Sequence, residues 1–188
     1  LMAQPEINLQ RRFELAGVTL IPFAMLDEQQ IVAVWQMRNH PEIARWMNTG
    51  GDISLEAHRA FMARQHQETR NLNYLCQDPQ GILGVLSLHR LDWHNRLAWL
   101  GIYRNPWRSE KRLGARLLTA VNRLAFDVAH LHTLKLEVAA DNERAIQAYL
   151  SAGFRHEGAW REAVYRPQTT NHVDLVLMGI TEQEWTHS

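Results

Sequence analysis

The stretch LEVAADNERAIQAYLSAGF, residues 136–154, decides the fold, because an apolar strand runs directly into a polar turn and then a short helix. Asn142, Ala145 and Tyr149 follow at intervals of three and four, so they share one face of that helix. Gly153 ends the helix and Phe154 returns the chain to the core. A unit of this kind sets polar side chains beside the end of a strand, where a site can be built.

Composition limits the classes of protein that remain. The chain has 188 residues, of which 46% are hydrophobic, so we expect one domain over residues 1–188, with residues 1–5 a disordered terminal segment. Twenty basic and twenty acidic residues cancel, which argues against nucleic acid or an anionic membrane as a partner. The apolar runs are too short to span a bilayer and no signal segment opens the chain, so we expect a cytoplasmic protein.

The chain has a single cysteine, Cys76, so a disulfide within the chain and a thiolate metal cluster are both excluded. Cys76 lies in an apolar run and is expected to be a buried hydrophobe without a chemical role. His130 and His132 come nearest to the spacing of metal ligands, but that signal is weak and we expect no metal.

Periodicity predicts an α/β order of elements. Residues 13–20 predict a first strand, Asp27 and Ser54 predict helix caps, and Pro41 suits the first turn of a further helix. Later strands are predicted over 72–77, 82–89, 97–103, 134–138, 156–165 and 173–179, and later helices over 113–128 and 143–152. This order predicts one sheet with helices on both faces.

A basic loop precedes the helix that begins near Gly114. Arg108, Lys111 and Arg112 lie in this loop, close to the amides at the helix N-terminus, so together they could neutralise a diphosphate without a metal. The alternative is an ordinary helix start with solvated charges.

Together, the unit at 136–154 and this loop resemble the acetyl-CoA cradle of the GCN5-related N-acetyltransferases. The resemblance implies a mixed, mostly antiparallel sheet splayed at the acetyl-CoA site, with acetyl-CoA as co-substrate. In the family's loop pattern Gly114 matches, whereas Ser109 and Arg112 occupy places usually held by Gln or Arg and by glycine. The cofactor contacts that the resemblance implies are Ile102, Tyr103, Arg104, Arg108, Ser109, Lys111, Arg112, Leu113, Gly114, Ala115, Asn142 and Ala145.

Two residues are candidates for acid–base catalysis. Tyr149 is the implied general acid to the departing thiolate, and the alternative is a tyrosine that only covers apolar surface. Glu137 points away from its strand neighbours Leu136 and Val138. Burial there would suit Glu137 to act as a general base, directly or through water. The alternative is a solvated or lysine-paired strand residue.

The order of motifs from about residue 35 to residue 160 resembles one branch of the family. That branch acetylates the 4-amino group of a UDP-linked amino-dideoxy sugar in pseudaminic acid biosynthesis, which serves flagellin glycosylation. The acceptor contacts that this resemblance implies are Arg38, Trp46, Met47, His58, Ser87, His89, Arg90 and Tyr103. Each of them also has a structural reading, as a helix cap, a surface histidine or a core side chain.

Two rival functions remain at this stage. A protein N-terminal or polyamine N-acetyltransferase would share the cradle, although the basic residues in the front third of the chain suit an anionic acceptor better. A non-catalytic acyl-CoA-binding module would need neither Tyr149 nor Glu137. A homodimer is compatible with the sequence.

Overall fold

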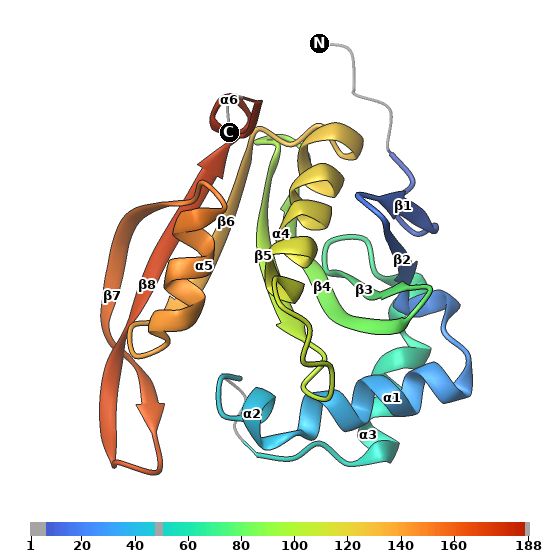
Figure 1. Cartoon of the computed structure of the whole chain (residues 1–188), viewed down its shortest axis with the longest axis horizontal. Coiled ribbons are helices and arrows are strands. Elements are labelled where there is room, and N and C mark those ends of the chain that lie inside the picture. Colours follow the sequence, from blue (N-terminus) through green and yellow to red (C-terminus); the bar gives the residue numbers. More distant parts are fainter. Residues whose placement is uncertain (1–6, 48–50, 187–188) are drawn as a thin grey trace.

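The computed structural model describes residues 7–47 and 51–186, and its centre is an eight-stranded sheet (Figure 1). Along the sheet the strands run in the order β1-β2-β3-β4-β5-β6-β8-β7, and only β5 and β6 pair in parallel. The bounds are β1 Phe13–Leu15, β2 Val18–Pro22, β3 Leu72–Asp78, β4 Gly81–Asp92, β5 Leu97–Arg104, β6 Thr133–Ala139, β7 Arg155–Arg166 and β8 Asn171–Thr181. The predicted mixed, mostly antiparallel sheet is confirmed, while the expectation for residues 1–5 lies outside the described residues.

The helices are α1 Glu28–Asn39, α2 Pro41–Ala44, α3 Leu55–Ala63, α4 Leu113–Arg123, α5 Glu143–Ser151 and α6 Glu182–Thr186, with short turns η1 Phe23–Met25 and η2 Gln65–Gln67. Asp27 forms a capping box with Gln30, and the Ser54 hydroxyl accepts a hydrogen bond from the Ala57 amide at 3.1 Å. These caps stand where the sequence placed them. None of the described helices combines the length and apolar content needed to cross a membrane.

Two predicted elements differ from those observed. Residues 13–20 form two strands, because Ala16 and Gly17 adopt φ angles of 53° and 72° and reverse the chain between them. Residues 113–128 begin as α4 but continue as a π-helical stretch, η3 Leu124–Val128, in which the Ala129 amide donates to the Leu124 carbonyl at 2.9 Å. No pattern in the sequence predicted α6.

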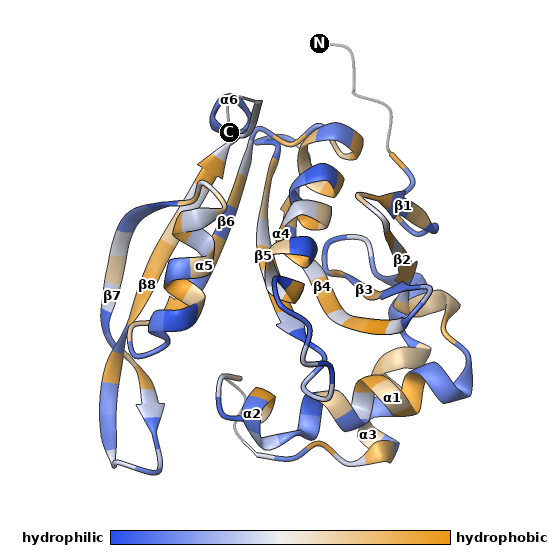
Figure 2. Cartoon of the chain, viewed as in Figure 1, coloured by the Kyte–Doolittle hydropathy of each residue, from blue (hydrophilic) through white to orange (hydrophobic). Residues whose placement is uncertain are grey.

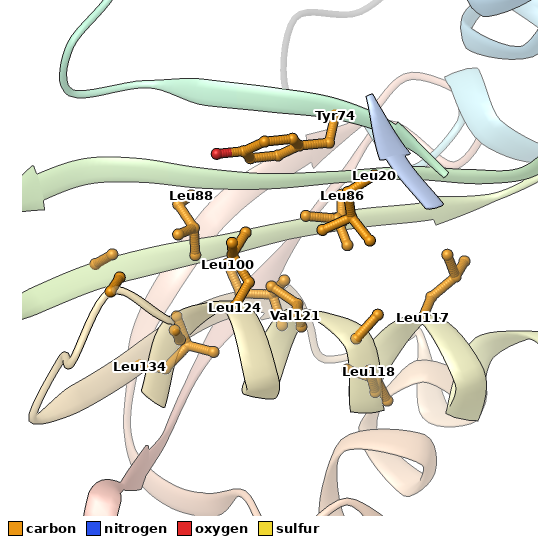
Figure 3. Packing of buried hydrophobic residues seen from close by; sticks show 14 of the residues in the cluster. Leu20, Tyr74, Leu86, Leu88, Leu100, Leu117, Leu118, Val121, Leu124 and Leu134 are labelled. Carbon is orange, nitrogen blue, oxygen red and sulfur yellow. The ribbon is translucent and has the colours of Figure 1, made fainter. Parts of the chain in front are cut away.

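The main core lies between the sheet and α4. Leu117, Val121 and Leu124 of this helical segment meet strand residues such as Leu86 and Leu134, and all five are fully buried (Figure 3). Cys76 belongs to the same core, where burial raises the pKa of its thiol, as suits an inert residue. The spacing of three and four along α4 therefore fixes that helix on the sheet.

The opposite face of the sheet carries α1 and α3. Val34 and Met37 of α1 and Met62 of α3 form a second buried cluster with Leu75 and Val85 of the sheet. This cluster covers only part of that face. Farther along β4 and β5 the same face becomes polar.

The sheet opens between β5 and β6. Their parallel ladder joins only Leu97–Trp99 to Thr133–Lys135, and in the described chain no later pair continues it. Beyond that point the two strands diverge (Figure 1). β5 stays attached to β4 as far as the Gly84–Arg104 pair. At Gly84, where φ is +157°, a Cβ atom would lie 2.3 Å from the Tyr103 carbonyl oxygen, so this close approach requires glycine. The splay thus forms because β5 stays paired with β4 along one edge while its other edge separates from β6.

Candidate active site

Tyr149 lies on α5, the helix that follows the turn after β6, and packs against the main core. Asn142 caps α5 by accepting a hydrogen bond from the Ala145 amide at 3.3 Å. Tyr149 is half-buried, with its ring edge-on to Phe154 at a centroid distance of 5.9 Å. Burial raises the pKa of Tyr149 to about 12. Its phenol therefore keeps a proton at neutral pH and could donate it.

The loop between β5 and α4 is hydrophilic (Figure 2) and ends in a strained residue. Arg112 has a φ of +66°, the left-handed conformation that the family's glycine would adopt at no cost. For a non-glycine residue this conformation costs about 1–2 kcal/mol. The α4 N-cap, Arg112, makes no side-chain capping bond, so the amides of the first turn, Leu113, Gly114 and Ala115, remain suited to phosphate. Ser109, Lys111 and Arg112 are exposed beside them.

Arg108 faces inward and holds this loop to the β3–β4 turn. Its guanidinium donates to both carboxylate oxygens of Asp78 at 2.9 and 2.8 Å, and Arg116 reaches the same carboxylate at 2.9 Å. Glu110 pairs with both arginines. The sequence placed Arg108 among the phosphate contacts. In the structure its charge is matched by carboxylates, so Lys111 and Arg112 are the exposed cations of the loop.

The polar part of the second sheet face forms a strip that reaches the opening. We call Asn73, Ser87, His89, Trp99, Gly101 and Glu137 the polar strip, because strand pairing and the two-residue repeat of strands put them on one face. Buried Ser87 donates to Asn73 at 2.7 Å, and Asn73 donates to Gln65 at 3.0 Å. Ser87 therefore uses its hydroxyl proton within the protein.

Glu137 and Arg90 meet at the end of the polar strip. Arg90 adopts a φ of +52° at an irregularity in β4, and its guanidinium lies over the Trp99 ring at 4.9 Å. The same guanidinium donates to Glu137 at 2.9 Å. Glu137 is therefore neither a solvated nor a lysine-paired residue. Its side chain is 16% exposed and paired with arginine, and its role as a base stays a prediction.

The predicted acceptor residues of α1 and α3 are deeply set. Arg38 is buried near Tyr103 and Asp52, and burial lowers the pKa of Arg38 while those two neighbours act in the opposite direction. Burial also raises the pKa of Tyr103. His58 is 5% exposed, with Nε2 at 3.1 Å from the Ile31 carbonyl oxygen. His58 thus joins α3 to α1 in this structure, and the alternative reading of a surface histidine is wrong because the ring is buried.

Two guanidinium groups lie close to the Trp46 ring, where the end of β7 contacts the residues after α2. Arg45 and Arg166 stand 4.6 and 5.0 Å from this ring. Arg166 also donates to both oxygens of Asp141 at 2.9 and 2.8 Å and to the Arg45 carbonyl at 3.2 Å. Arg166 therefore joins the front helices to the turn before α5. Half-buried Met47 follows Trp46.

Several residues of this site gave no readable signal in the sequence. Arg166 is 121 residues from its Arg45 partner, and Asp78 is 30 residues from Arg108. Gly101 could be read only as part of a strand. Among the predicted cofactor contacts, Ile102 packs against the main core and Arg104 ends β5. Across residues 7–47 and 51–186 no group of three or more potential metal ligands gathers.

A shallow surface depression lies away from the opening. It is lined by Thr69, Arg70, Leu91, Asp92 and Trp93, at the end of β4 where β5 begins. None of the predicted site residues lines it. The splay, and not this depression, gathers the candidate chemical groups.

Comparison with known proteins supports the resemblance. Residues 18–155 match the family described as acetyltransferase (GNAT) domain. The chain is 30% identical to the acetyltransferase PseH of Campylobacter jejuni over 132 residues, which are 70% of this chain and 81% of that protein. It is 31% identical over 158 residues to YdaF of Bacillus subtilis, described as a candidate ribosomal N-acetyltransferase, covering 79% of this chain and 83% of that protein.

Among solved structures, a spermidine N-acetyltransferase from Vibrio cholerae in complex with CoA and spermine superimposes with a TM-score of 0.82. The match covers 91% of this chain and 99% of that one at 19% identity, which shows the fold alone.

Asp78→Asn should loosen the phosphate loop. The substitution removes the charge of a carboxylate whose side chain is 6% exposed and leaves Arg108 and Arg116 with Glu110 alone. Breaking a buried ion pair costs about 3–5 kcal/mol of unfolding free energy. We expect KM for acetyl-CoA to rise about tenfold, or about 1.4 kcal/mol. Asp92→Asn, at the last residue of β4, is the matched control. An unchanged KM for acetyl-CoA in Asp78→Asn would show that the loop before α4 does not contribute to cofactor binding.

The same variant has a pH signature. Hydrogen bonds from Arg108, and then from Arg116, hold the pKa of Asp78 well below its usual range. Its stabilisation is therefore complete above the unfolded value of about 3.9 and is lost as the pH falls toward the depressed folded value. The gap in unfolding free energy between wild type and Asp78→Asn should stay constant from about pH 6 to about pH 8 and shrink below about pH 4. Denaturant titrations at each pH measure it.

Proposed function

The chain belongs to the GNAT family of acetyltransferases, and we propose that its acceptor is the 4-amino group of a UDP-linked amino-dideoxy sugar. Membership of the family makes it an N-acetyltransferase with acetyl-CoA as co-substrate. The proposal places the enzyme in pseudaminic acid biosynthesis, in the cytoplasm, where acetyl-CoA and nucleotide sugars occur together.

The observation that carries the acceptor is the 30% identity with PseH, spread over 81% of that protein. It agrees with the branch that the order of motifs indicates, from Arg38 in α1 to Tyr149 in α5. The similar identity with YdaF makes a peptide amine the natural competitor.

Charges around the opening also suit a nucleotide sugar. Arg90 lies at the end of the polar strip, and Arg45 and Arg166 lie within 5.0 Å of the Trp46 ring, which offers a flat surface. The carboxylates of Glu137 and Asp141 match the charges of Arg90 and Arg166, so Arg45 beside the Trp46 ring supplies the further positive charge. Guanidinium groups recognise phosphate oxygens and aromatic rings stack on a base, whereas a polycation would meet repulsion here.

Within this proposal each end of the cofactor has a place. The exposed cations Lys111 and Arg112 and the first amides of α4 suit the diphosphate. Backbone groups of Gly101–Arg104 have no β6 partner in the described ladder, so they can bond the arm and the thioester carbonyl. Tyr149, protonated at neutral pH, gives its proton to the departing sulfur.

An acceptor panel tests the proposal. Purified protein is given acetyl-CoA with a UDP-4-amino-4,6-dideoxy sugar, spermidine or a peptide with a free N-terminus, and free thiol is measured. We expect thiol release with the UDP-amino sugar at a kcat/KM at least about 100-fold above that with the other amines, because their phosphate and base contacts are missing. The free sugar without UDP is the matched control. Preference for spermidine or the peptide would contradict the proposed acceptor.

Tyr149→Phe tests the acid. Phenylalanine keeps the ring contact with Phe154 and removes only the hydroxyl, so binding of acetyl-CoA should change little while kcat falls by about 10²–10⁴. Exposed Tyr165→Phe on β7 serves as control. Because the pKa of Tyr149 is about 12, the wild-type rate should show no loss from its ionisation up to about pH 10. A kcat unchanged by Tyr149→Phe would remove this residue from the acid role.

A further inference from the structure

The imidazole of His89 lies over the β5 residue at which the two strands part. A Cβ atom on Gly101 would stand 2.9 Å from His89 Nε2 and 3.2 Å from its Cδ2. Gly101 is two residues beyond Trp99, the last β5 residue in the parallel ladder. Glycine thus leaves room for the ring at this point. The ring borders the opening from the polar side of the sheet.

The surroundings of His89 favour its neutral form. Burial lowers the pKa of His89, and the positive charge of Arg90 lowers it further, while Glu68 acts in the opposite direction. Glu137, the other acid of this region, directs its charge to Arg90. With the proton on Nδ1, the Nε2 atom over Gly101 carries a free lone pair near pH 7.

Glu137 already has a protein partner. Its oxygen already accepts a hydrogen bond from Arg90 at 2.9 Å, and that guanidinium is itself held over the Trp99 ring. The Glu137 carboxylate is thus occupied by a protein partner, and its paired oxygen is directed at the guanidinium. In this arrangement Glu137 orients Arg90.

We propose that His89, rather than Glu137, accepts the proton that the acceptor amine loses. The inference rests on the proposed N-acetyl transfer at this site. The neutral amine forms the N–C bond to the thioester carbonyl carbon and the C–S bond breaks. His89 Nε2 takes the N–H proton, and Tyr149 gives its proton to the sulfur. The imidazolium returns a proton to the tyrosinate through solvent, so an amine and a thioester become an amide and a thiol.

The test compares pH profiles of kcat for wild type, His89→Ala, His89→Gln and Glu137→Gln. The rate with a neutral base rises as the pH increases through the ring pKa, which burial places below about 6.5. We expect both His89 variants to lose this limb and about 100-fold in kcat, and added imidazole to restore activity to His89→Ala. Glu137→Gln should be slower yet keep the limb. The acceptor amine also loses a proton as the pH rises, and this adds a limb to the pH profile that all variants share.

Exposed His94→Gln, in the turn after β4, is the matched control and should behave as wild type in every assay. Affinity for acetyl-CoA and the melting temperature show whether each variant folds. A limb that survives in His89→Gln, or one that disappears only in Glu137→Gln, would overturn the assignment. So would an absence of imidazole rescue in a folded His89→Ala protein.

A second readout does not depend on the acceptor. NMR titration of the histidine rings, with His89 assigned by its absence in His89→Gln, should give a ring pKa below about 6.5 that matches the kinetic limb. A ring still protonated at pH 7 would refute the base. If the UDP-amino sugar is inactive but another amine of the panel reacts, the acceptor proposal fails, and the pH profiles with that amine still decide the role of His89.

Discussion

The parallel pairing of β5 with β6 ends after three residues, and the rest of the site depends on this release. β5 is kept in place by β4 as far as Arg104, which the glycine at position 84 permits by its close backbone approach. The edge of β5 that no longer pairs with β6 exposes backbone groups. The two faces of the sheet beside this edge carry different side chains. Tyr149 comes from the side of α4 and α5, and the polar strip with His89 and Arg90 comes from the other.

Two ion networks fix the borders of this opening. Asp78 holds the loop before α4 through Arg108 and Arg116, and this contact offsets the left-handed strain at Arg112. Arg166 joins Trp46 to the turn before α5. In the first network the charge of Arg108, which the sequence assigned to phosphate, is matched by carboxylates instead. The exposed cations of the loop before α4 are therefore Lys111 and Arg112.

Local rules predicted much of this fold, and long-range contacts account for most of what they missed. The caps at Asp27 and Ser54 and the strand and helix of 136–154 follow from nearest neighbours and periodicity, whereas the mixed, mostly antiparallel sheet was implied by the family resemblance. The reversal at Ala16 was missed, because alanine rarely adopts a positive φ. The inward turn of Arg108 and the burial of His58 depend on partners 30 and 27 residues away, which no local pattern encodes.

The central claim is that acetyl-CoA occupies the splay. Amide hydrogen exchange with and without acetyl-CoA tests it directly, because bound backbone groups exchange more slowly. We expect slowing at Gly101–Arg104 and at Leu113–Ala115, with no change around the depression at Thr69, Arg70 and Trp93. Protection at that depression, with unchanged exchange along β5, would contradict the account.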